Sequence, residues 1–128
     1  MKKIMFISLF LSLFLSPNIF EVKASLSYRT CGDMYQNFLE YRKMQNGLDF
    51  DSGRVGHYMG YLIAHAEALS FLQELTVGGN GFPDDSTIGQ LSLIYGEYLE
   101  ENPQIHHRPG MECFFSALRG AFPNYFKG

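Results

Sequence analysis

The spacing of apolar residues constrains the fold of this chain more than any other feature of its sequence. Four stretches, at about 29–45, 52–76, 87–101 and 109–122, repeat apolar side chains at intervals of three or four, as one face of an α-helix does. Segments rich in Gly, Pro and Asp separate these stretches. The sequence therefore predicts an all-α domain of four helices, with no second domain.

The apolar positions also identify the side of each predicted helix that faces the core. They are Cys31, Met34, Tyr35, Phe38 and Tyr41; then Val55, Tyr58, Met59, Leu62, Ala66 and Leu69; then Ile88, Leu91, Ile94, Tyr95, Tyr98 and Leu99; and last Met111, Phe114, Phe115, Leu118 and Phe122. Beside the last face, Cys113, Ala117 and Gly120 form a row of small residues. We expect this row to permit the close approach of another helix.

Capping and stop signals set the ends of the predicted helices. Asn46 and Gly47 are a stop signal for the first helix. "TIGQ" has the spacing of a capping box at the start of the third. Pro109 is suited to a first turn, so we expect the last helix to begin there, with 104–108 as a loop.

The first 24 residues have the layout of a secretory signal peptide. Two lysines precede an almost unbroken apolar run over 4–15, and "VKA" at 22–24 supplies the small residues of a cleavage site. We expect cleavage after Ala24, which leaves a periplasmic domain over 25–128. The alternative is a retained membrane anchor, but the run is short for a span that needs about 20 apolar residues.

Cleavage would leave a mildly acidic protein. It removes three of the ten Lys+Arg and one of the thirteen Asp+Glu, so the formal charge becomes −5. This charge argues against nucleic acid or anionic lipid as a partner and is compatible with a basic protein surface. About a hundred residues remain, which is enough for one modest core.

Both cysteines, Cys31 and Cys113, lie in the predicted mature region. An even number of cysteines in a small exported domain favours one disulfide. That bond would close a loop of about 80 residues and contribute up to about 4 kcal/mol on the chain-entropy model. The alternative is a free catalytic thiol, which would need a positioned base and would be exposed to oxidation.

The four histidines do not predict a metal site or a catalytic site. His57 and His65 are eight residues apart on one predicted helix, or about 12 Å, which is too far for both to bind one metal ion. We expect them on the flank of the helix or at the edge of the core. His106 and His107 are adjacent and point in different directions, so we expect solvent contacts and capping near a helix end. No catalytic residue, metal or cofactor is predicted.

Three acidic residues, Glu97, Glu100 and Glu101, lie near the end of the third predicted helix. A solvated face is the favoured interpretation, and a binding role is the alternative. Negative charges at this end oppose the helix dipole, so we expect the end to fray unless Asn102 and Pro103 stop the helix sharply.

An ordered set of short motifs resembles a known family. The set is "GYLIAHAEAL" at 60–69, "GFPDDSTIGQL" at 81–91, "YLEENPQIHHRPG" at 98–110 and "ALRGAFP" at 117–123. It covers about 70 residues and resembles the Rap/Tai family of type VI secretion amidase immunity proteins. The resemblance implies a small exported helical protein that protects bacteria against injected cell-wall amidases, often as a homodimer.

Two positions depart from the family pattern. Family members often have a cysteine two residues before the Gly-Tyr pair and another before the loop proline, where this chain has Tyr58 and Gly81. Both members of that expected pair are missing together. The resemblance therefore implies one disulfide fewer here and a less constrained loop over 77–86.

The same loop is the candidate for partner binding. An inhibitor of this kind presents a rigid protrusion that fills the amidase cleft, with a few well-packed anchors and complementary charge. Phe82 would be the aromatic anchor, and Asn80, Asp84 and Asp85 the polar and charged contacts. The alternative is an ordinary solvated connection whose aspartates cap the third helix.

Two other functions compete with immunity. A Cys–His enzyme is disfavoured because no nucleophile elbow, HExxH motif or paired carboxylates accompany His106, His107 and Cys113. A small periplasmic chaperone of the acid-stress type is the second alternative, since its histidines and carboxylates would change charge strongly on acidification. Any small acidic protein shares that property.

Overall fold

The computed structural model describes residues 29–77, 82–83 and 85–125, and in this part of the chain it confirms an all-α domain. Its four α-helices are α3 (Cys31–Gln45), α4 (Ser52–Val77), α5 (Ile88–Glu101) and α6 (Gly110–Ala121), with a short 3-10 helix, η1 (Pro103–Ile105), after α5. No helix among the described residues is long and apolar enough to span a membrane. The predicted signal peptide, 1–24, lies outside the described residues.

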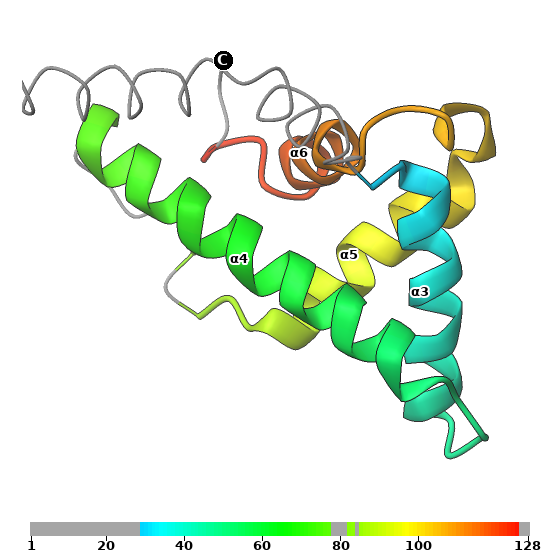
Figure 1. The fold of residues 1–128 in the computed structure, drawn as a ribbon. Coiled ribbons are helices and arrows are strands. Elements are labelled where there is room, and N and C mark those ends of the chain that lie inside the picture. Colours follow the sequence, from blue (N-terminus) through cyan, green and yellow to red (C-terminus); the bar gives the residue numbers. More distant parts are fainter. Residues whose placement is uncertain (1–28, 78–81, 84, 126–128) are drawn as a thin grey trace, which may run out of the picture.

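The helices cross one another rather than lying parallel. Figure 1 shows α3 against the first half of α4, α5 behind α4, and α6 seen end-on above them. α3 packs against α4, α5 and α6, and α5 also packs against α4 and α6. At about 1.5 Å per residue, the 26 residues of α4 span about 39 Å, so α4 extends beyond the other helices.

Side-chain caps explain where α3 and α5 begin. The Thr30 hydroxyl accepts from the Asp33 backbone N–H, and the Asp33 carboxylate accepts from the Thr30 N–H in return. These bonds hold the pKa of Asp33 below its ordinary value. Thr87 and Gln90 form the same reciprocal pair at α5, which confirms the predicted capping box. The cap of α5 is therefore Thr87.

Aromatic side chains fill the core where the predicted faces meet. Phe38, Tyr58, Tyr95 and Phe114 are all fully buried, and Tyr58 and Tyr95 stack with ring planes 4° apart. The Tyr58 hydroxyl donates to the Ser92 carbonyl, and the Tyr95 hydroxyl donates to the Gly110 carbonyl at 2.9 Å. At the position of one expected family cysteine, this chain thus has a buried, hydrogen-bonded tyrosine.

The buried face of α6 matches the predicted one in part. Phe114 and Leu118 are fully buried as predicted, and Cys113 and Ala117 are buried beside them, but Met111, which we predicted in the core, is 46% exposed. Gly120 is exposed and has open space beside it, so the prediction that it permits close approach of another helix is wrong. The buried face thus extends toward Cys113, which is bonded to Cys31 at the start of α3, and away from Met111.

The predicted disulfide between Cys31 and Cys113 is confirmed, with 6.1 Å between the two Cα atoms. It ties the start of α3 to α6, and both cysteines are buried.

The segment before α6 pairs with the start of α3 through its backbone. The Cys31 and Gly32 N–H groups donate to the Arg108 and His106 carbonyls at 2.8 and 2.9 Å, and the Gly110 N–H donates to the Arg29 carbonyl at 2.7 Å. We call these three bonds and the disulfide the terminal clamp. Pro109 precedes α6, with φ −56° and ψ 135°, so the helix begins one residue later than predicted. The predicted loop over 104–108 also begins within η1.

Candidate partner-binding groove

The connection between α4 and α5 carries the predicted partner-binding residues. Phe82 is half-buried and packs against the hydrophobic core, while Asp85 is exposed. Asn80 and Asp84 lie outside the described residues. The Ser86 N–H donates to the Pro83 carbonyl at 2.9 Å, so a turn leads from this connection to the cap of α5.

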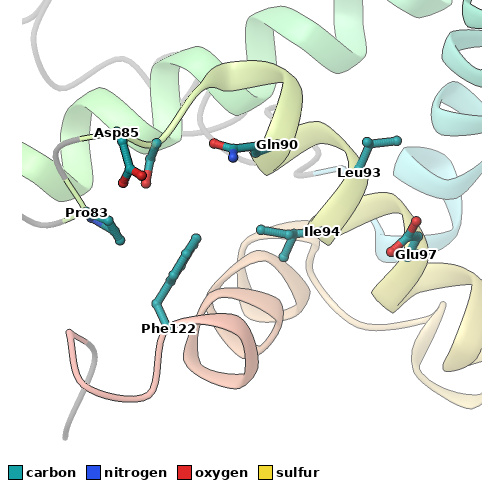
Figure 2. Close-up of a pocket in the computed structure, with 8 residues that line it drawn as sticks. Pro83, Asp85, Gln90, Leu93, Ile94, Glu97 and Phe122 are labelled. Carbon is teal, nitrogen blue, oxygen red and sulfur yellow. The ribbon is translucent and has the colours of Figure 1, made fainter.

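An open groove of about 400 Å³ lies beside this connection. Its lining consists of Pro83, Asp85, Ser86, Gln90, Leu93, Ile94, Glu97 and Phe122. Figure 2 shows Phe122, at the end of α6, with its ring directed toward the connection, and Ile94 projecting from α5 into the same space. We call this hollow the α5 groove.

A second hollow, of about 440 Å³, lies on the side of the connection that faces α4. Phe82 and Pro83 form part of its wall, and Glu67, Phe71 and Glu74 line it from α4. Pro83 and Ser86 line both hollows, so the described part of the connection, 82–83 and 85–86, forms a ridge between them. The ridge places Asp85 at the α5 groove and Phe82 at the hollow next to α4.

The charges along the α5 groove are all negative. Asp85 lies at one end and Glu97 at the other, while Leu93, Ile94 and Phe122 supply apolar surface between them. No Lys or Arg belongs to the described lining. The groove therefore matches an apolar side chain with basic groups around it.

The sequence did not predict several residues of this groove. For Glu97 a solvated face is the favoured prediction and a binding role the alternative, and Phe122, predicted in the core, is only half-buried. Leu93 lies outside the predicted apolar face and is 46% exposed. The only sign of the groove in the sequence is Leu93, an apolar residue off the predicted buried face, one helical turn before Glu97. It could not show that Phe122 comes to the same place.

Glu100 and Glu101, the other glutamates of α5, do not line the groove. Glu100 accepts two hydrogen bonds from the Arg42 guanidinium on α3, which lowers the pKa of Glu100 and raises that of Arg42. The Arg42 guanidinium also lies 4.7 Å from the centre of the Phe38 ring. Glu100 thus joins α5 to α3, while Glu101 is exposed.

The end of α5 is stopped at Asn102 and Pro103, the condition under which we expected it not to fray. The Asn102 side-chain amide donates to the Tyr98 carbonyl, and Nε2 of His106 lies 2.8 Å from the Leu99 carbonyl. The prediction of a histidine that caps a helix end is therefore confirmed for His106, whereas His107 is exposed.

The two histidines of α4 have different surroundings. His65 stacks on Tyr61 at a ring distance of 3.9 Å and is half-buried, as expected at the core edge, while His57 is exposed. Across residues 29–77, 82–83 and 85–125, no three His, Cys, Asp or Glu side chains are grouped to hold a metal ion. Both cysteines are in the disulfide, so neither offers a thiol for the alternative of a Cys nucleophile.

Comparisons with protein-family models, with curated proteins and with solved structures found no match to this chain.

Proposed function

We propose that this chain is a periplasmic immunity protein that binds a type VI secreted peptidoglycan amidase and inhibits it by occluding the active-site cleft. The ordered motifs that resemble the Rap/Tai family suggest this class of function. The observation that carries the proposal is the α5 groove, with its apolar centre and its two carboxylates beside the α4–α5 ridge. Inhibition by occlusion requires only a well-packed, complementary surface and no chemistry by the inhibitor.

The ridge and the groove suggest a division of roles. Asp85 and Glu97 would steer and orient basic groups at the rim of the amidase cleft. Leu93, Ile94 and Phe122 would receive an apolar side chain of the enzyme. Phe82, Asn80 and Asp84 stay predicted contacts of the partner, and the homodimer stays a prediction.

The test is inhibition of peptidoglycan hydrolysis by the purified protein. Each secreted peptidoglycan amidase encoded in the same genome is assayed with and without the mature chain, and binding is measured by calorimetry. The double variant Asp85→Asn with Glu97→Gln should bind at least about tenfold more weakly, with a slower association rate that depends less on salt. Glu101→Gln, the same kind of change at an exposed site on α5, should bind as the wild type does.

No binding to any of these amidases would refute the proposed function. Binding that is unchanged in the double variant would leave the function standing and would exclude the α5 groove as the contact surface.

One observation favours the chaperone alternative. Phe71 and Leu75, on the outer end of α4, are 60% and 66% exposed. Large exposed apolar side chains are what a chaperone offers to unfolded clients. A chaperone would suppress the aggregation of unrelated proteins at low pH, and Phe71→Ser with Leu75→Ser would abolish that activity. An immunity protein would show no such general protection.

A further inference from the structure

The connection between α3 and α4 exposes two large apolar side chains at its tip. Leu48 is 58% exposed and Phe50 is 43% exposed, with Asp49 between them. Figure 1 shows this connection projecting beyond the ends of both helices at the lower right. We call residues 48–50 the α3–α4 tip.

The α3 end of the tip is fixed by backbone hydrogen bonds. Gly47 adopts a left-handed conformation, with φ 69°, and its N–H donates to the Met44 carbonyl, while the Leu48 N–H donates to the Lys43 carbonyl. These are the two bonds of a Schellman motif, in which an apolar residue at the position of Leu48 usually packs back on its own helix. In this chain the residues of α3 against which Leu48 would pack are Lys43 and Arg42, which are not apolar, and Leu48 is exposed.

The α4 end of the tip is fixed by side chains. The Asp51 carboxylate accepts from the Arg54 N–H at 3.1 Å, as a helix cap does, and the Asp51 N–H donates to the Glu40 carboxylate at 2.8 Å. The Lys43 ammonium donates to the other oxygen of Glu40. Because both ends are held, a contact made by the tip would cost little conformational freedom, which favours affinity.

The charge of the tip narrows the class of partner. Asp49 and Asp51 are the only ionisable residues over 45–53. The nearest basic residues in the sequence on either side, Lys43 and Arg54, contact Glu40 and Asp51 respectively. An anionic membrane surface would need free basic residues here, so the tip suits a protein instead. A narrow convex tip fits a concave site with apolar walls and a basic rim.

We propose that the α3–α4 tip is a second anchor for the same amidase, and that Leu48 and Phe50 insert into an apolar recess with Asp49 facing a basic residue at its rim. This inference rests on the proposed function. Ser52, next to the tip, and Glu67, at the hollow beside the ridge, are 15 residues apart on α4, or about 22 Å. The tip and Phe82, the predicted anchor that lines the same hollow as Glu67, would therefore lie within the width of one protein–protein interface.

The test uses the mature chain and each secreted peptidoglycan amidase of the same genome, with calorimetry and hydrolysis as readouts. Leu48→Ala with Phe50→Ala should weaken binding and inhibition at least about tenfold, since exposed apolar anchors dominate interface affinity. Asp49→Lys should weaken them by a similar factor. Leu75→Ala, which truncates an equally exposed leucine at the far end of α4, is the matched control and should bind as the wild type does.

Four outcomes decide the proposal. A loss confined to the tip variants, with their helical content and thermal unfolding unchanged, supports it. Tip variants that inhibit as the wild type does overturn it and leave the proposed function intact. An equal loss with Leu75→Ala also overturns it, because the effect would not belong to the tip. A wild type that binds none of the amidases overturns the proposed function, and the tip proposal with it.

Discussion

The contact between Gly96 and Phe38 sets how closely α5 and α3 approach. Gly96 is buried in the middle of α5, and a Cβ atom at this position would overlap the ring of Phe38. The ring has little room to move, because it is fully buried and lies 5.7 Å from the ring of Tyr58. Arg42 covers it from the outside. We predict that Gly96→Ala strongly destabilises the fold.

The expected magnitude has two parts of opposite sign. Alanine is favoured over glycine in a helix by about 1 kcal/mol. Overpacking a well-filled core costs about 1–3 kcal/mol, and overlap with an immobile ring puts Gly96 at the upper end of that range. The free energy of unfolding should therefore fall by about 2 kcal/mol.

Gly60 offers the matched control. It lies within α4, and a Cβ atom there meets nothing within 4 Å. Gly60→Ala should therefore raise the free energy of unfolding by about 1 kcal/mol from helix propensity alone. The same chemical change should thus differ by about 3 kcal/mol between the two sites, because only Gly96 faces Phe38.

The assay is urea unfolding followed by circular dichroism, since the chain contains no tryptophan. A double-mutant cycle completes the test. Phe38→Ala alone should cost about 3–5 kcal/mol, but on that background Gly96→Ala should no longer destabilise. If Gly96→Ala is as stable as Gly60→Ala in the wild-type background, the close packing of α3 on α5 described here is wrong.

Two further predictions concern covalent and ionisable groups. Replacing Cys31 and Cys113 by alanine releases a loop of 82 residues and should lower the free energy of unfolding by up to about 4 kcal/mol, measured by urea unfolding; a loss below about 1 kcal/mol would contradict it. Burial raises the pKa of Tyr61 to about 12 and also raises the pKa of Tyr58 and Tyr95. Tyrosines of the unfolded chain ionise near pH 10, so above that pH the unfolded chain loses protons that the folded chain keeps. The free energy of unfolding should therefore be at its full value below about pH 10 and should fall as the pH rises toward 12. Urea midpoints that do not fall over that interval, measured alongside tyrosinate absorbance, would count against it.

Periodicity in the sequence was enough to predict the helices and most of the core. The ends of α3, α4 and α5 lie within about two residues of the predicted ones, because capping residues such as Thr87 act through bonds to near neighbours. The disulfide followed from the number of cysteines and the predicted compartment. These signals are local or compositional, so one sequence is sufficient to read them.

The features that sequence did not predict depend on residues far apart in the chain. The orientation of α6 about its own axis depends on its packing against α5 and α3, so spacing alone could not show that Cys113 is buried and Met111 is exposed. The α5 groove forms because Phe122, at the end of α6, lines the same hollow as Asp85 and Glu97. Periodicity predicts which face of a helix is buried, but it does not predict which distant segment of the chain packs beside that face.

The terminal clamp has a consequence for the order in which the domain is completed. Its three hydrogen bonds and its disulfide join residues 29–32, at the start of α3, to residues 106–113, about 80 positions later. A nascent chain that lacks 106–113 cannot close it, and the long separation makes closure slow. A protein that crosses a membrane unfolded, as proposed for this one, benefits from that order, because the fold cannot be finished before nearly the whole chain is available.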